Sequence, residues 1–145
     1  MRFLDTNVLL YAACPGPKEA DKQRIAVALL GSTDLCLSVQ VLQEFYAQAT
    51  RPTRPGAVGH ELGVRLIRTW LRFPVQDLST DILLAALDIK ARYQLSYWDA
   101  AIVAAAAAMG STELLTEDLD TGAVIAGVRV VNPFAGGNAP PTTPP

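Results

Sequence analysis

Residues 1–8 read MRFLDTNV, and the interpretation of the whole chain starts from this stretch. The apolar residues Phe3 and Leu4 run straight into Asp5, so a short buried strand is predicted to end in a carboxylate. That carboxylate can cap the helix predicted for residues 6–12. It can also line a binding site, because open parallel sheets bind ligands outside the carboxyl ends of their strands. The choice depends on whether other acids occupy comparable positions.

The bulk composition indicates one folded domain. The chain has 145 residues, of which 50% are hydrophobic and 18% are charged, which is enough apolar material for a core. The longest apolar run, residues 100–109, is shorter than the roughly 20 residues that span a bilayer. The N-terminus lacks a signal-like pattern, so we expect a cytosolic protein without a membrane segment. We predict a domain over residues 1–134 and a flexible tail, AGGNAPPTTPP, over residues 135–145.

Charge and metal-binding residue types narrow the chemistry. The net charge is −2, which is no global signature of nucleic-acid binding. Its distribution is uneven, with five arginines against one acid in residues 51–73 and five acids against one base from Asp99 onward. His60 is the only histidine and the two cysteines lie far apart, so a zinc site is excluded.

Short apolar runs alternate with longer helical patterns along the chain. This alternation predicts βαβ units and a three-layer α/β domain, in which a parallel sheet of four or five strands is flanked by helices. The predicted strands are residues 2–4, 35–37, 73–75, 113–115 and 128–131. The predicted helices are residues 18–30, 39–49, 60–72, 80–93 and 97–108.

Three further acids each allow two interpretations. Asp99 follows Ser96 with the spacing of a capping box, but it shares its helical face with apolar residues, where a carboxylate needs a partner or a cation. Glu44 borders the apolar face of its helix and can equally be a solvated glutamate. Asp118 follows a predicted strand, where it is either a ligand at the strand end or part of a polar turn.

Taken together, the four acids favour a metal site. Asp5 and Asp118 are predicted at strand ends, and Glu44 and Asp99 on the first turns of helices that follow strands, so all four should converge on one sheet edge. Like charges repel, so such a cluster makes sense around divalent cations. Oxygen ligands without His or Cys indicate Mg²⁺ or Mn²⁺. Carboxylates that hold two such ions about 4 Å apart are a common arrangement for hydrolysing phosphodiesters.

The motifs that contain these acids resemble a known family. FLDTNVLLYA, QVLQEFY, LSYWDAAIVAAA and LLTEDL occur in this order within residues 3–134. In these motifs the chain resembles PIN-domain ribonucleases, and most closely the VapC-type toxins of bacterial toxin–antitoxin pairs. The resemblance implies a catalytic, metal-binding quartet of Asp5, Glu44, Asp99 and Asp118. It also implies supporting polar residues at Asn7 and Thr116, and an extra acid at Asp120.

The resemblance further implies an activity and partners. These are Mg²⁺- or Mn²⁺-dependent endonucleolytic cleavage of RNA that leaves 5′-phosphate and 3′-hydroxyl ends, a homodimer, and inhibition by a VapB-like antitoxin. A PIN-like RNA- or protein-binding module, or another Mg²⁺-dependent phosphoesterase, stays open as an alternative. A phosphatase with an aspartyl nucleophile would need a second acid where Asn7 stands.

Two other groups of residues have functional and structural interpretations. The spacing of three arginines predicts one helical stripe that contacts RNA phosphates or an acidic antitoxin segment, with a solvated helix face as the alternative. These residues are Arg65, Arg68 and Arg72. We expect Trp70, Tyr97 and Trp98 in the core or in a dimer contact rather than stacked on bases.

Overall fold

The sheet at the centre of the domain positions every other element. In the computed structural model, which describes residues 1–135, six strands lie side by side in the order β3-β2-β1-β4-β6-β5. Five of them are parallel, as predicted, and β5 runs antiparallel to β6. The strands are β1 Arg2–Leu4, β2 Leu35–Ser38, β3 Val75–Gln76, β4 Glu113–Leu115, β5 Val124–Ile125 and β6 Val128–Val131.

The sequence pattern does not predict β5, which has two residues and forms a hairpin with β6. The turn between them places Ala126 and Gly127 at φ values of 50° and 81°. Positive φ at both central residues suits a tight hairpin turn, but alanine rarely adopts it. The usual Asn-Gly or Asp-Gly signal of such a turn is therefore missing from the sequence.

Six helices surround the sheet in the described part of the chain, and four of them begin with a side-chain cap. Asp5, Ser38, Ser79 and Ser96 each accept a hydrogen bond from a backbone N–H of the helix that follows, which satisfies a donor that the helix leaves free. The helices are α1 Thr6–Ala13, α2 Ala20–Leu30, α3 Val39–Ala49, α4 His60–Trp70, α5 Thr80–Tyr93 and α6 Tyr97–Ala108.

Three of the five longer helices have the predicted bounds, and two are shorter than predicted. Helix α2 begins at Ala20 rather than at residue 18, because the preceding residues form a turn in which the Glu19 N–H donates to the Gly16 carbonyl. Helix α4 ends before residue 72. Pro74 follows closely, and a proline disfavours helical geometry in the residue before it.

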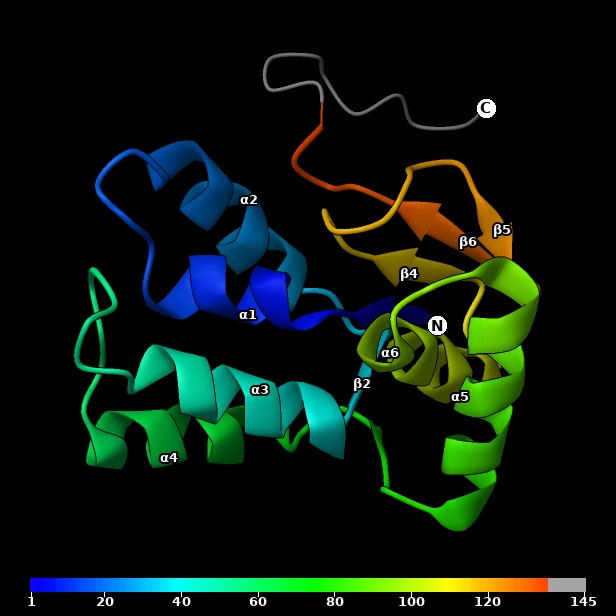
Figure 1. Cartoon of the computed structure of the whole chain (residues 1–145). Helices are drawn as coiled ribbons and strands as arrows, with labels where there is room; N and C mark the ends of the chain where they lie inside the picture. The colour runs from blue at the N-terminus through cyan, green and yellow to red at the C-terminus, as the bar shows by residue number, and fades with distance from the viewer. Residues whose placement is uncertain (136–145) are drawn as a thin grey trace.

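The helices form two groups, on either side of the sheet. Figure 1 shows α1 to α4 gathered on one side of the view and α5 with α6 on the other. Helix α6 packs along α5 and contacts β2, β4 and β6, whereas α3 contacts β2 and α1 contacts α2 and α3. Small residues let α6 lie close to the sheet, because Ala100, Ala101 and residues 104–106 are all buried. The three-layer α/β architecture is therefore as predicted.

The hydrophobic core includes residues from the first strand to Phe134, near the end of the described chain. Phe3 of β1 and Leu114 of β4 are fully buried, and Phe134 packs edge-on against Tyr11. The predicted tail falls almost entirely on residues 136–145, which lie outside the described residues, so its character stays a prediction. Within residues 1–135, no helix is both long enough and apolar enough to cross a membrane.

Candidate active site

Asp5 and Thr116 meet because β1 and β4 are parallel neighbours. The register pairs Leu4 with Leu115, so the residues that follow the two strands lie side by side at the carboxyl edge of the sheet. Asp5 is only 6% exposed. Its Oδ1 accepts from the Thr6 backbone N–H at 2.7 Å, and its Oδ2 accepts from the Thr116 hydroxyl at 2.8 Å. Asp5 is thus both the N-cap of α1 and a group of the strand-end site.

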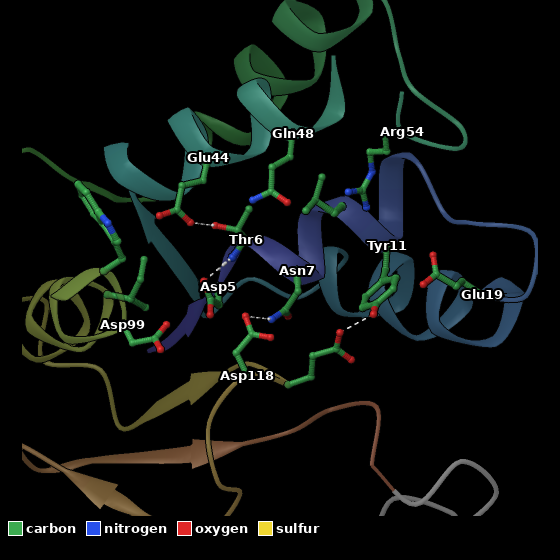
Figure 2. Close-up of a pocket in the computed structure, with 14 residues that line it drawn as sticks. Asp5, Thr6, Asn7, Tyr11, Glu19, Glu44, Gln48, Arg54, Asp99 and Asp118 are labelled. Atoms are coloured by element: carbon green, nitrogen blue, oxygen red, sulfur yellow. Dashed lines mark hydrogen bonds between the residues drawn. The ribbon is translucent and has the colours of Figure 1, made fainter. Parts of the chain in front are cut away.

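The Thr116 hydroxyl joins three groups. Its oxygen donates to Asp5 and accepts from the Asn7 side-chain amide at 3.2 Å and from the Asp118 backbone N–H at 3.1 Å. A hydroxyl has one donor and two acceptor positions, so all of them are used. The Asn7 amide also donates to the Asp118 carboxylate at 3.2 Å, as Figure 2 shows. Asn7 and Thr116 therefore hold Asp5 and Asp118 in place.

Glu44 reaches the same space from α3. Its Oε2 accepts from the Thr6 hydroxyl at 2.8 Å, and its Oε1 accepts from the Gln40 amide at 2.9 Å. The Gln40 amide also donates to the Trp98 carbonyl at 3.3 Å, which ties α3 to the start of α6. Glu44 lies in the second turn of its helix rather than the first. Its half-buried, doubly bonded carboxylate does not match the alternative of a solvated glutamate.

Asp99 comes from the first turn of α6, and α6 follows α5 rather than a strand. Ser96 accepts a hydrogen bond from the Asp99 backbone N–H at 3.1 Å, as the capping-box spacing predicts. The return bond of a capping box is not formed. Among residues 1–135 the Asp99 carboxylate accepts no hydrogen bond, and it faces a cavity instead.

The four predicted acids line one cavity of about 280 Å³. Figure 2 shows them facing a common space from different segments of the chain. The lining residues are Asp5, Thr6, Asn7, Leu10, Tyr11, Glu19, Glu44, Gln48, Arg54, Trp98, Asp99, Ile102, Glu117 and Asp118. Six of these described residues are acids and one, Arg54, is a cation. The cavity therefore attracts cations and repels anions until a cation is bound.

Burial dominates the ionisation of Asp5. Removal from water raises the pKa of Asp5 to about 6, and the charges of Asp118 and Glu44 push it in the same direction. The hydrogen bonds from Thr116 and from the Thr6 N–H favour the charged form and limit the rise. A cation bound beside Asp5 would therefore stabilise its charged form.

A second polar network, which the sequence does not predict, lies at one end of the cavity. The Tyr11 hydroxyl donates to Oε1 of Glu117, and the Lys22 ammonium donates to Oε2 at 3.0 Å and to the Tyr11 oxygen at 3.1 Å. Hydrogen bonds to Tyr11 and Glu117 raise the pKa of Lys22. Glu117 is thereby paired with a cation. Lys22 and Glu117 lie 95 residues apart, so no local motif could reveal the pair.

The donors at the cavity fit a hard divalent cation. They are oxygens, without His or Cys among the lining residues. The Asn7 Oδ1 atom is buried and has no hydrogen-bond partner in residues 1–135, which leaves an oxygen beside Asp118 available as a ligand. No three His, Cys, Asp or Glu side chains in the described chain are placed to hold an ion by themselves. Waters would complete the coordination, as is usual for Mg²⁺.

Other predicted residues lie outside the cavity. Asp120 is exposed and is not one of its lining residues. Arg65 and Arg68 are exposed on α4. Arg72 lies beyond the end of α4, so the predicted stripe of three is wrong. The Arg72 guanidinium donates instead to the Leu30 carbonyl at 2.8 Å and lies over a phenylalanine ring.

The two tryptophans have different environments. Trp70 is 3% exposed and packs edge-on against Phe45, as expected for a core residue. Trp98 is 65% exposed and lines the acidic cavity, so it is not a core residue of this chain. Tyr97 is half-buried and packs edge-on against Trp98.

Comparison with known proteins identifies the class to which this fold and site belong. Residues 2–126 match the family model of the PIN domain, and the chain belongs to the PIN-domain family. None of the curated proteins matches the chain.

Solved structures, among them a toxin and a toxin–antitoxin complex, share the fold. VapC20 of Mycobacterium tuberculosis, a sarcin-ricin-loop-cleaving toxin, is 22% identical with a TM-score of 0.68, over 89% of this chain and 99% of that one. A toxin–antitoxin complex from Klebsiella pneumoniae is 23% identical, with a TM-score of 0.67 over 92% and 98%. FitAcB from Neisseria gonorrhoeae is 21% identical, with a TM-score of 0.68 over 93% and 99%. The family and fold predicted from the sequence are confirmed.

Proposed function

We propose that this protein is a Mg²⁺- or Mn²⁺-dependent endoribonuclease and the toxin of a toxin–antitoxin pair. One observation carries the proposal. Asp5, Glu44, Asp99 and Asp118, which are far apart in the sequence, line one cavity at the carboxyl edge of the sheet. Membership of the PIN family supports nuclease chemistry there.

The residues around the cavity have distinct roles in this proposal. A divalent cation held at the quartet by carboxylates together with waters would activate a water and offset charge that develops on the scissile phosphate. Asp5 is held by two hydrogen bonds, Glu44 by Thr6 and Gln40, and Asp118 by Asn7, so three carboxylates are fixed before substrate binds. Within residues 1–135 the Asp99 carboxylate has no such donor, so it would be available to ligate a cation or to accept a proton as a general base.

The proposed partners come from the structural neighbours. FitAB bound to a DNA fragment is 25% identical to this chain with a TM-score of 0.65. VapBC from Salmonella typhimurium, also bound to DNA, has a TM-score of 0.59. By analogy, we expect this chain to bind a VapB-like antitoxin, to form a homodimer and to act on RNA.

Asp99→Asn tests the proposal against two alternatives, that Asp99 is only a capping residue and that the protein only binds RNA. If Asp99 belongs to a metal site, the variant should no longer cleave RNA and should gain less thermal stability from added Mn²⁺, because ligand stabilisation follows the affinity of the folded state. Without metal, the variant should melt no lower than wild type, because one of several neighbouring negative charges is removed. The assays are cleavage of total RNA with mapping of the new ends, and thermal melts with chelator and with excess Mn²⁺.

Asp120→Asn is the matched control, because Asp120 is exposed and lies outside the cavity. It should cleave RNA and respond to Mn²⁺ as wild type does. If Asp99→Asn melts lower than wild type, still cleaves RNA and keeps the full response to Mn²⁺, Asp99 is only a capping residue and the proposal fails. If wild type binds RNA but leaves it intact with either ion, the binding-module alternative is correct.

A further inference from the structure

We propose that Arg54 binds a phosphate of the RNA strand next to the phosphate that is cut. The inference rests on the proposed function and adds a substrate-binding residue to it. Arg54 lies in the connection between α3 and α4, and Figure 2 shows its side chain pointing toward Tyr11 at the edge of the acidic cavity. It is the one cation among the described lining residues.

The Arg54 side chain has no partner within residues 1–135. Its Nε atom is buried and makes no hydrogen bond, although the cavity holds six acids. Two of these acids are engaged by other donors. Glu19 accepts from the Gly16 N–H at 2.5 Å, and Glu117 accepts from Tyr11 and Lys22. A buried guanidinium nitrogen without an acceptor is costly, so it points to a ligand that supplies one.

The backbone around Arg54 is fixed before any ligand binds. The Arg54 N–H donates to the Arg51 carbonyl at 3.0 Å, and the Arg54 carbonyl accepts from the Ala57 N–H at 3.1 Å. The loop also lies close to the α1–α2 connection. A Cβ at Gly56, which has φ +74°, would lie 3.0 Å from the Pro15 carbonyl oxygen. Only glycine suits both the angle and the approach, so the loop is held where it presents Arg54 to the cavity.

A phosphate is the acceptor that this position fits. A guanidinium offers donors in a planar fork that matches two phosphate oxygens. A polyanionic RNA strand is repelled by the six acids unless it finds positive charge on both sides of the cut. A cation at the quartet would supply one side, and Arg54 at the edge of the cavity would supply the other. The competing explanation is that Arg54 only balances the charge of the acids.

Binding measurements on two variants and a matched control separate these explanations. The variants are Arg54→Gln and Arg54→Lys, and the control is Arg51→Gln, an exposed arginine of the same loop. A short labelled single-stranded RNA of mixed sequence is titrated in Mg²⁺ at several salt concentrations. These titrations use proteins that also carry Asp99→Asn, so that the RNA stays intact. Cleavage of the same RNA is then measured without Asp99→Asn.

We expect Arg54→Gln to lower kcat/KM about ten- to hundred-fold, mainly through KM, because a charged hydrogen-bonded contact to substrate is lost. The slope of log K against log salt should become shallower by about 0.7, the value for one phosphate contact on a single strand. Arg54→Lys should restore the slope but only part of the affinity, because it keeps the charge and loses the fork. Arg51→Gln should match wild type in both RNA affinity and salt slope.

Charge balancing predicts a different pattern. Arg54→Gln would then melt lower than wild type in chelator, while KM and the salt slope stayed unchanged, and that result would overturn the inference. If wild type cleaves RNA and Arg54→Gln cleaves it with the same kcat/KM, the inference is overturned and the proposed function is left intact. Absence of both RNA binding and cleavage by wild type would overturn the proposed function, and this inference with it.

Discussion

Replacing Asp5 with Asn should destabilise the metal-free protein at pH 4 and stabilise it at pH 7.5. Burial raises the pKa of Asp5 to about 6, whereas an aspartate in the unfolded chain titrates near 3.9. Between these values the native state holds a proton that the unfolded chain has lost. The free energy of unfolding therefore falls as pH rises through this window, by about 3 kcal/mol in total.

The asparagine variant lacks this titration, but it also loses one acceptor. Its amide oxygen can still accept from the Thr6 N–H, while its amide nitrogen cannot accept from the Thr116 hydroxyl. That loss costs about 1 kcal/mol at every pH. The variant should therefore be about 1 kcal/mol less stable than wild type at pH 4 and about 2 kcal/mol more stable at pH 7.5. At this chain length the change corresponds to about 3 °C of melting temperature per kcal/mol.

Urea unfolding of both proteins in chelator, at half-unit steps from pH 4 to pH 7.5, measures the difference. Asp120→Asn, at an exposed position outside the cavity, should differ from wild type by a constant amount over the same range. A constant difference between wild type and Asp5→Asn would show that the Asp5 charge carries no burial cost. Asp5 would then be an ordinary helix cap, and the electrostatic argument for a cation site would lose its main support.

Two further changes probe the surroundings of the site. Thr116→Val should destabilise the protein by about 1–3 kcal/mol at pH 7, because it leaves buried partners of the hydroxyl unsatisfied, and it should slow RNA cleavage. Thr112→Val, at an exposed threonine just before β4, should change stability by less than about 0.5 kcal/mol in the same urea series; equal effects of the two would mean that the Thr116 bonds are unimportant. Replacing Arg65 and Arg68 with Gln should weaken binding of RNA or antitoxin and flatten its salt dependence, because both are exposed on α4. Affinity unchanged for both ligands across a salt series would leave these arginines as a solvated helix face.

Much of the fold and of the quartet could be predicted from local pattern. Apolar runs that end in polar residues marked four of the parallel strands, and serine caps preceded α3, α5 and α6. The strand predicted for residues 73–75 overlaps β3 only at Val75. These signals are local because strand burial and helix capping depend on residues a few positions apart. Asp5 and Asp118 were predictable for the same reason, since each follows a buried strand. The hairpin strand β5 was not, because its turn places an alanine where asparagine or glycine is usual.

The surroundings of the quartet were decided only by the tertiary structure. Thr6 bonds Glu44 from 38 residues away, and Lys22 bonds Glu117 from 95 residues away. No spacing rule links such pairs, because they meet through the order of strands in the sheet and the packing of α1 against its neighbours. The position of Arg54 at the edge of the cavity depends likewise on a loop that lies against the α1–α2 connection. The sequence by itself indicated which carboxylates would meet at one edge of the sheet, because each signal was local. The packing of distant segments determined which side chains hold these carboxylates and placed Arg54 beside them.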